Sequence, residues 1–314
     1  MRVIFFGTPE FAVPTLSKLL TEPDFEVIGA VTQPDTRRGR GNQTTPSPVK
    51  ALALQYPNLK IWQPERLKKD AATLKEIAEA NADVFVVVAY GQILSQAILD
   101  LPKLGCINVH GSLLPKYRGA APIQWAIALG ETVAGITTMQ MDAGIDTGAM
   151  LLKESLPIAP DDNAETLSQK LAVLGADLLI QTLRQLDTIV PEAQDDSTST
   201  YVPVISKSDL QLDWRKSAVE LRDRIRGFYP NCHTNYGDLR VKITASEVSD
   251  TLTKTAEPPV GTVIELRKNI GFLVQTGAGT LLVKEVQPAG KRSQTGWDFA
   301  NGTRLKIGDV FSFV

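Results

Sequence analysis

The chain has 314 residues, of which 43% are hydrophobic and 22% charged, and its formal net charge is −2. This length and composition are typical of a globular protein of two domains. The sequence contains no run of the roughly 18–20 apolar residues that a membrane span needs. Its near-neutral charge argues against a generally basic nucleic-acid-binding protein. Residues 1–206 hold 17 Lys and Arg against 23 Asp and Glu, whereas residues 207–314 hold 16 against 12, so the second part is the one suited to an anionic partner.

The first two hundred residues alternate segments typical of strands and of helices, which is the pattern of a parallel α/β sheet. A compact apolar strand is predicted at 2–6, and Thr8 and Pro9 indicate the N-cap and first turn of a helix that ends about residue 20. Further elements are expected as strands at 25–32, 83–89 and 106–109 and as a helix at 70–81. The predicted fold of this part is a doubly wound, Rossmann-like sheet.

The later residues change in character. Two paired strands, a loop at 142–148 and one long amphipathic helix precede a polar stretch at 195–200, which is typical of a linker. A short helix follows at 217–226, and from residue 239 short strands recur between turns, as in a small β-barrel of the OB-like, oligonucleotide-binding type. The paired strands are expected at 135–141 and 149–156, and the long helix at 162–186. We therefore predict a first domain at 1–189, a linker at 190–208 and a second domain at 209–314.

Several common functions find no support in the sequence. The turn after the first strand lacks G-x-G-x-x-G, and no G-x-x-x-x-G-K-[ST] occurs, so nothing indicates a dinucleotide or a nucleoside triphosphate. Cys106 and Cys232 lie far apart and match no zinc or redox spacing, so we expect two buried thiols and no metal. No signal-peptide pattern follows Met1, which predicts a cytoplasmic protein, and no exposed apolar stripe calls for a partner, which favours a monomer.

The most informative stretch is residues 107–122, which follows a predicted strand and holds an amide, an imidazole and a hydroxyl within five residues. Asn108 and His110 stand two residues apart and therefore point to the same side of the strand. About thirty residues later, Asp142 and Asp146 lie in a loop that contains glycines. Amide, imidazole and carboxylate are the groups needed for acyl transfer to a weakly nucleophilic amine.

Each of these residues also has a structural interpretation. His110 alone would more often be a hydrogen-bonded histidine at a strand end, and His233 is expected to be a surface histidine. Asp146 could stabilise its own turn, and Asp142 could cap the same loop.

The chain resembles the 10-formyltetrahydrofolate-dependent formyltransferases, and most of all those that act on methionyl initiator tRNA. Besides Asn108, His110 and Asp146, the resemblance is carried by the run Ser-Leu-Leu-Pro-x-Tyr-Arg-Gly at 112–119 and by segments at 3–12, 32–35, 46–50, 205–207 and 286–291. It implies that Asn108 and His110 stabilise the oxyanion and that His110 moves protons. It also implies that Asp146 sets the protonation state of the histidine and accepts the proton of the amine, without a metal.

The resemblance further implies a pocket for the formyl donor, 10-formyltetrahydrofolate. A flat pterin needs backbone donors and acceptors beside apolar surface, which two loops of this chain offer. Leu113 and Leu114 could instead be ordinary core, and the role of Gln92 is open because many relatives carry an apolar residue there. The folate-binding candidates are Tyr90, Gly91, Gln92, Ile93, Leu94, Ser112, Leu113, Leu114, Pro115 and Asp142.

The polar segment at 35–45 carries three arginines and two glycines. Such loops are usually only solvated, but the resemblance implies that this one enters the acceptor end of the initiator tRNA. Arginine suits that role because its planar guanidinium pairs with phosphates and stacks on bases. Arg40 would be the principal contact and Arg37 and Arg38 would bind phosphates. Contacts to the tRNA backbone are expected from Lys207, Arg240, Lys242, Lys291 and Arg292.

Two alternatives remain. A related enzyme could formylate a small amine, such as a glycinamide ribonucleotide or an amino sugar nucleotide. A non-catalytic RNA-binding protein with a vestigial α/β domain is the second. The arginine-rich loop and the basic barrel argue against the first, and the intact Asn108, His110 and Asp146 against the second.

Overall fold

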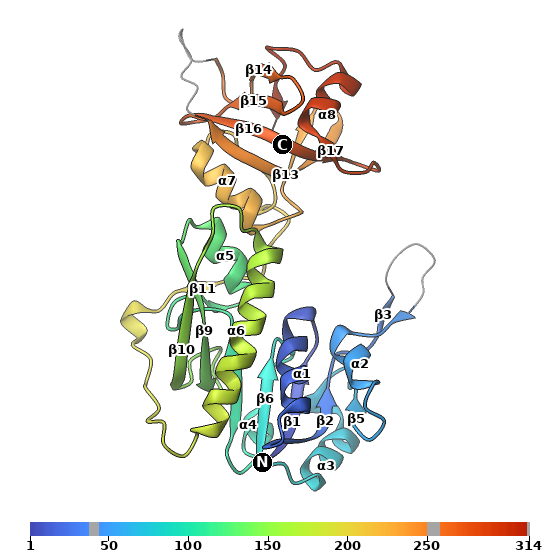
Figure 1. The fold of residues 1–314 in the computed structure, drawn as a ribbon, viewed down its shortest axis with the longest axis vertical. Helices are drawn as coiled ribbons and strands as arrows, with labels where there is room; N and C mark the ends of the chain where they lie inside the picture. Colours follow the sequence, from blue (N-terminus) through green and yellow to red (C-terminus); the bar gives the residue numbers. More distant parts are fainter. Residues whose placement is uncertain (38–43, 250–257, 313–314) are drawn as a thin grey trace. The chain divides into compact units, whose positions relative to one another are not determined.

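The computed structural model describes residues 1–37, 44–249 and 258–312, and the chain divides into two compact units (Figure 1). The first comprises Met1–Gly119, Ala134–Leu156 and Ser168–Val202. The second comprises Ala120–Val133, Pro157–Leu167 and Pro203–Val314. Neither unit is continuous in sequence, because the short segments Ala120–Val133 and Pro157–Leu167 group with the C-terminal residues.

The first unit is built on a seven-stranded sheet with the order β10-β9-β7-β6-β1-β2-β5. Its strands are β1 (Arg2–Gly7), β2 (Glu26–Val31), β5 (Lys60–Trp62), β6 (Val84–Val88), β7 (Cys106–His110), β9 (Val133–Gln140) and β10 (Met150–Pro157). Five neighbouring strands of this sheet, β5, β2, β1, β6 and β7, run parallel to one another, and β9 is antiparallel to β7. The chain starts in the middle at β1, moves outward to β2 and β5, and then returns to the other side at β6. The prediction of a doubly wound sheet is confirmed, with its switch point between β1 and β6.

Helices and short strands connect these strands. The helices are α1 (Val13–Thr21), α2 (Pro48–Ala53), α3 (Ala71–Glu79), α4 (Gln96–Leu99) and the long α6 (Ala164–Arg184), with 3₁₀ turns at Glu10–Ala12, Leu67–Lys69 and Asp196–Thr198. The short strands are β3 (Thr36–Arg37), β4 (Thr44–Thr45), β8 (Arg118–Gly119) and β11 (Tyr201–Val202). No helix in the described part of the chain is both long and apolar enough to cross a membrane.

The predicted N-cap at Thr8 is wrong. The chain first makes the 3₁₀ turn at Glu10–Ala12, with no side-chain cap, and α1 begins only at Val13. The Thr8 hydroxyl instead donates to the carbonyl oxygen of Tyr90, 3.0 Å away. Thr8 lies at the switch point, where the end of β1 meets the end of β6, and its hydroxyl oxygen accepts from the backbone amide of Gln33 at 3.3 Å instead of from a helix amide.

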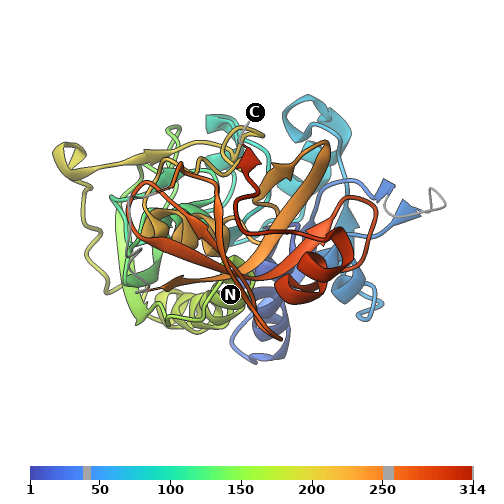
Figure 2. The same cartoon turned by 90° about the horizontal axis from the view of Figure 1, so that it is seen from above.

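The second unit contains an antiparallel sheet, whose strands are coloured orange to red in Figure 2. Their order is β14-β15-β16-β13-β12-β18, and β17 is added beside β16. Its strands are β12 (His233–Tyr236), β13 (Leu239–Ser249), β14 (Val263–Arg267), β15 (Gly271–Gln275), β16 (Thr280–Pro288), β17 (Gln294–Thr295) and β18 (Phe311–Ser312). An antiparallel bridge between Thr262 and Val310 links the two ends of this order, so the sheet curls into a half-barrel. The predicted β-barrel class is confirmed.

Three helices accompany this sheet, α5 (Pro122–Ala128), α7 (Ala218–Gly227) and α8 (Gly296–Thr303). The sequence did not predict α8, because its glycines and threonine resemble turn residues; its N-cap Thr295 accepts a hydrogen bond from the amide of Asp298. Burial of large aromatic rings holds the unit together. The rings of Phe272 and Phe311 stack with centroids 5.3 Å apart.

Both cysteines are free and buried, as expected. Burial raises the pKa of the Cys106 thiol and of the Cys232 thiol to about 12. Thiols of that kind stay protonated at neutral pH and are poor nucleophiles.

Candidate active site

Asn108, His110 and Asp146 come together at the carboxyl end of β7. The Asp146 carboxylate oxygen Oδ1 lies 3.5 Å from Asn108 Nδ2 and 3.6 Å from His110 Nδ1. The side chains of His110 and Asp146 are only 7% and 14% exposed. Asn108 and His110 reach the same oxygen because residues two apart on a strand point to one face.

The other ring nitrogen of His110 is already engaged. His110 Nε2 lies 3.0 Å from the carbonyl oxygen of Tyr117. A carbonyl oxygen only accepts hydrogen bonds, so we assign the hydrogen to Nε2. Nδ1 is then the atom through which the imidazole can exchange a proton with Asp146.

Asp146 is held by its second oxygen as well. Its Oδ2 accepts a hydrogen bond of 2.8 Å from the backbone amide of Gly119. Gly119 has φ +99°, and a Cβ at this position would come within 2.5 Å of the Val202 carbonyl oxygen, so only glycine fits. Asp146 itself has φ +53°, in the left-handed region that residues other than glycine adopt only where their surroundings hold them.

Asp142, in the same loop, has a clear structural role. Its Oδ1 accepts hydrogen bonds from the amide of Gly144 at 3.0 Å and from the hydroxyl of Thr147 at 2.7 Å. These bonds shape the loop that carries Asp146. A contact of Asp142 with a pterin stays a prediction.

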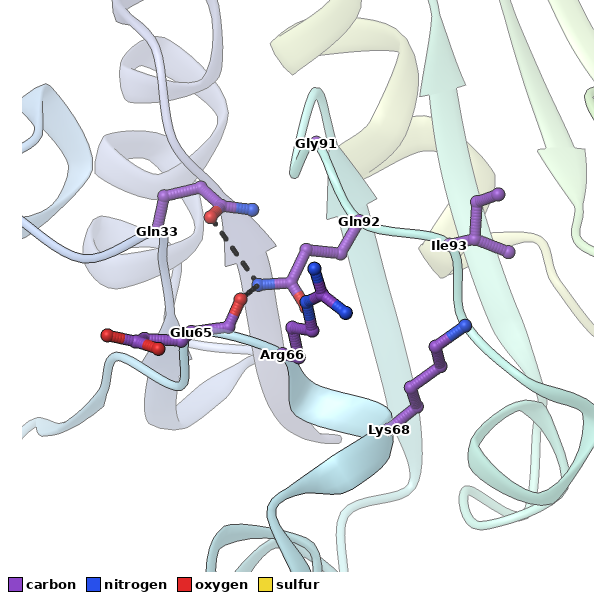
Figure 3. Close-up of a pocket in the computed structure, with 7 residues that line it drawn as sticks. All are labelled: Gln33, Glu65, Arg66, Lys68, Gly91, Gln92 and Ile93. Carbon is purple, nitrogen blue, oxygen red and sulfur yellow. Dashed lines mark hydrogen bonds between the residues drawn. The ribbon is translucent and has the colours of Figure 1, made fainter.

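A hollow of about 350 Å³ opens beside the turn that follows β6 (Figure 3). Gly91, Gln92 and Ile93, three of the folate-binding candidates, line it. The other lining residues are Gln33, Glu65, Arg66 and Lys68. Gln33 lies in the segment 32–35, one of those that carry the resemblance. Glu65, Arg66 and Lys68 were not predicted, because charged residues after a short strand have no distinguishing pattern in the sequence.

Gln92, whose role the sequence left open, forms hydrogen bonds with several residues beside this hollow. Its Oε1 accepts from the amide of Leu67 at 2.8 Å, and its Nε2 donates to the carbonyls of Pro64 and Glu65 at 3.1 and 3.2 Å. Its Nε2 also lies 3.4 Å from Oε1 of Gln33 (Figure 3). Gln92 therefore links the end of β6 to the segment after β5.

The neighbours of this turn differ in exposure. Ile93 is 74% exposed, whereas Tyr90 and Leu94 are buried in the core of the first unit. The ring of Tyr90 packs edge-on against Phe6, and burial raises the pKa of its hydroxyl.

The turn at 112–115 is also firmly held. The hydroxyl of Thr137 donates to the Ser112 carbonyl at 2.7 Å and accepts from the Leu114 amide at 3.0 Å. The Leu114 side chain is buried in a cluster with Met139 and Met150. Leu114 thus lies in the core, which the sequence allowed, while Leu113 and Pro115 are half-buried.

Comparison with known proteins identifies the family of this chain. The "Formyl transferase" family model matches residues 1–183, and the "Formyl transferase, C-terminal domain" model matches residues 204–304. A methionyl-tRNA formyltransferase of Trichormus variabilis is 55% identical over 99% of this chain and 98% of its own length. One from a Cyanothece species is 55% identical, covering 98% of each chain.

The chain belongs to the methionyl-tRNA formyltransferase family. Solved structures of formyltransferases share its fold. The N-formyltransferase of Helicobacter canadensis, in complex with folinic acid and dTDP-3-aminofucose, has a TM-score of 0.63 at 19% identity and covers 90% of this chain and 98% of its own. The methionyl-tRNA formyltransferase of Clostridium thermocellum has a TM-score of 0.57 at 19% identity, covering 80% and 94%.

The basic residues of this formyltransferase are spread over both units. Arg38 and Arg40 lie outside the described residues, and Arg37 ends β3, which pairs with β4 in antiparallel fashion. Lys207 is exposed in a turn of the second unit.

The other four basic candidates gather at one end of β13 and β16. Arg240 and Lys242 lie on β13, where Lys242 pairs with Gln287 of β16. Lys291 and Arg292 are exposed in the turn that follows β16. Arg240 Nη2 lies 3.0 Å from Nδ1 of His233, which is half-buried rather than a free surface histidine. Burial lowers the pKa of His233, and the charges of Arg240 and Lys242 lower it further, against a backbone contact with Asn231 that raises it.

Among the residues that the structure describes, no three or more His, Cys, Asp or Glu side chains form a group able to hold a metal ion.

Proposed function

We propose that this enzyme transfers the formyl group of 10-formyltetrahydrofolate to the α-amino group of methionyl initiator tRNA, giving N-formylmethionyl-tRNA for translation initiation. One observation carries the proposal. The amide of Asn108 and the imidazole of His110 converge on a single carboxylate oxygen of Asp146, in a chain whose relatives are named for this activity.

Asn108 is suited to stabilise negative charge on the formyl oxygen. Its amide lies 3.5 Å from Asp146, a long contact that leaves the N–H group able to turn toward another acceptor. The oxygen of the formyl group becomes negative as the amine adds to its carbon. Loss of one such donor typically raises the barrier by about 2.7–4 kcal/mol.

Asp146 and His110 are suited to move protons. The attacking amine must lose its proton, and Asp146 Oδ1 can accept it, because the Gly119 amide binds the other oxygen. His110 Nδ1, 3.6 Å away, can relay that proton to the folate nitrogen, whose bond to the formyl carbon breaks so that tetrahydrofolate leaves. His110 can donate to the formyl oxygen from Nε2 only if it releases the Tyr117 carbonyl, so Asn108 is the better placed donor.

The hollow at Gly91–Ile93 fits part of a folate. It offers backbone groups, the amides of Gln33 and Gln92, and the exposed apolar side chain of Ile93, which is the mixture a flat pterin needs. The bound 10-formyltetrahydrofolate would supply the formyl group. Solved relatives of the fold are described with folinic acid and with tetrahydrofolic acid.

The tRNA would be held by basic residues. We assign catalysis to the predicted domain at 1–189 and tRNA binding to the one at 209–314, with 190–208 as the segment between them. Arg240, Lys242, Lys291 and Arg292 form the tRNA-facing cluster, and Lys207 adds to it. Arg37, Arg38 and Arg40 would contact the acceptor end. We expect the enzyme to act as a monomer in the cytoplasm, where initiator tRNA is charged and used.

The test is formyl transfer from 10-formyltetrahydrofolate to charged methionyl initiator tRNA, run beside free methionine and a glycinamide ribonucleotide. Activity on the charged tRNA alone supports the proposal. Activity only on a small amine would keep the chemistry at Asn108, His110 and Asp146 but contradict the tRNA substrate. No transfer and no folate binding would favour a non-catalytic RNA-binding protein. Arg40→Ala should raise the KM for charged tRNA and leave the KM for the folate unchanged.

A further inference from the structure

The segment at 192–202 is attached to the active-site loops of the first unit. Glu192 forms a backbone bridge with Met150, and β11 pairs in parallel with β8. The Thr200 carbonyl accepts from the Arg118 amide at 2.8 Å, and its hydroxyl accepts from the Tyr117 amide, also at 2.8 Å. This segment therefore lies beside the residues that hold His110 and Asp146.

Gln194 makes the contact that reaches Asp146. Its Nε2 donates to the carbonyl oxygens of Asp146 and of Gly148, both at 2.8 Å. Both hydrogens of the amide are thus used on the loop that carries the carboxylate. Gln194 is half-buried, whereas the residues on either side of it are exposed.

Arg118 fixes Gln194 in turn. Arg118 is buried, with 8% of its surface exposed. Its Nε donates to Gln194 Oε1 at 2.9 Å, and its Nη2 pairs with Asp196 at 2.8 Å. The planar guanidinium therefore sets the direction of the Gln194 amide.

Asp146 is then held from two sides. The Gly119 amide binds its carboxylate, and the Gln194 amide binds its backbone carbonyl. Its left-handed backbone, with φ +53°, requires such support. Gly119 follows Arg118 directly, so one short strand supplies the amide that binds the carboxylate and the guanidinium that fixes Gln194.

We propose that Gln194 is a positioning residue for formyl transfer, which sets the place of the Asp146 carboxylate beside Asn108 and His110 through the main chain of the 146–148 loop. The inference rests on the proposed function. Gln194 acts through Asp146, so its loss should lower kcat while both substrates bind as before.

The experiment compares the full-length enzyme with Gln194→Leu, which removes the amide at similar size, and with Gln194→Glu. The second variant keeps an acceptor for Arg118 but removes both donors and places a carboxylate against two carbonyl oxygens. We expect kcat to fall about 30- to 100-fold in both, the cost of displacing a reacting group by about 1 Å. The KM for charged tRNA and for the folate should stay within about threefold.

A spectroscopic readout separates positioning from loss of stability. The chain has only two histidines, so the imidazole ¹H–¹⁵N signals of His110 and His233 can be told apart with His233→Gln. In both Gln194 variants the His110 signals should move and the His233 signals should stay. Gln181→Leu, the same change at an exposed position of α6, is the matched control and should leave kcat and both sets of signals unchanged.

The inference is overturned if both variants keep kcat within threefold of the parent enzyme, if the His110 signals do not move, or if Gln181→Leu loses as much activity. If Gln194→Leu does not fold, the kcat and the His110 signals of Gln194→Glu alone test the inference. Absence of transfer by the parent enzyme would instead contradict the proposed function, and the His110 signals would still test the position of Asp146.

Discussion

At the scale of single residues, the site depends on which groups the two carboxylate oxygens of Asp146 contact. Asp146 offers one oxygen to the backbone amide of Gly119 and the other to Asn108 and His110. The first contact is short and the other two are long. The carboxylate oxygen bound to Gly119 is therefore fixed in place, and the oxygen near Asn108 and His110 remains available to an approaching amine.

Asn108→Ala should lower kcat about 10²- to 10³-fold, the usual cost of losing one oxyanion donor. Folate affinity should change little, because Asn108 lies at the end of β7, outside the hollow lined by Gly91–Ile93. Steady-state kinetics with charged tRNA and equilibrium binding of a non-reactive folate measure the two effects. Asn108 has no part in the chemistry if kcat is unchanged in a variant that melts like the parent.

His233 should make stability depend on pH. Its pKa is lowered, first by burial and then by Arg240 and Lys242. Below the ordinary value of about 6.5 the unfolded chain therefore binds the proton more readily than the folded one, and stability is lost as the pH falls through that window. Above it both states are neutral and His233 contributes nothing.

The measurement is the free energy of unfolding of the parent protein and of His233→Gln at pH 7.5 and pH 5.5. The parent should lose more stability on acidification than the variant, which has no group to protonate there. An equal loss in both proteins would show that His233 does not carry the effect.

At the scale of elements, the polar segment after α6 is the main surprise. Its composition predicts a linker from about residue 195. The structure groups residues up to Val202 with the first unit, and ties them to the loops around Asp146. A polar segment can be ordered by hydrogen bonds alone, and such bonds have no periodicity in the sequence.

Helix α7 shows the same principle in the second unit. The Arg226 guanidinium donates to the carbonyls of Ala159 and Asp162, at 2.8 and 2.7 Å, and pairs with Asp223 at 3.1 Å. Asp223 also pairs with Arg222 at 2.8 Å, and its side chain is only 7% exposed. These charges attach the segment at 157–167 to α7.

Asp223→Ala should lower the free energy of unfolding by about 3 kcal/mol, because it leaves the Arg226 charge without its partner in a largely buried place. Urea denaturation followed by circular dichroism measures the change. Lys216→Ala, which breaks the exposed pair of Lys216 with Glu220, should cost about 0–1 kcal/mol. Similar losses in the two variants would contradict a special role for the Asp223 cluster.

At the scale of the whole molecule, charge and chemistry are divided. The acidic part of the sequence contains Asn108, His110 and Asp146, and the basic part contains the cluster of Arg240, Lys242, Lys291 and Arg292. We expect the positive charge of this cluster to attract a tRNA, because the tRNA backbone is negatively charged.

Binding of tRNA should therefore weaken with salt, with a slope of about −0.7 to −0.9 in log K against log salt for each phosphate neutralised. Arg240→Ala should reduce the slope by about one phosphate's share. Lys153→Ala, an exposed lysine on β10, is the control and should leave it unchanged. A flat response in the parent enzyme would exclude an extended contact with tRNA.

The sequence by itself determined the class of each fold, the strands β1, β2, β6 and β7, and the segment that carries Asn108 and His110. Unbroken apolar runs and residues two apart on a strand are local patterns, so they can be read without the structure. The N-cap at Thr8 failed because its hydroxyl is engaged by residues distant in the chain: it accepts from the Gln33 amide and donates to the Tyr90 carbonyl.

Only the tertiary structure decided which groups surround Asp146. Gly119 binds its carboxylate and Gln194 its carbonyl, from positions 27 and 48 residues away in the chain. The same holds for the hollow, where Gln33, Arg66 and Lys68 meet Gly91 from separate segments. Hydrogen bonds between distant residues follow from the path of the chain, and no local pattern of residues encodes that path.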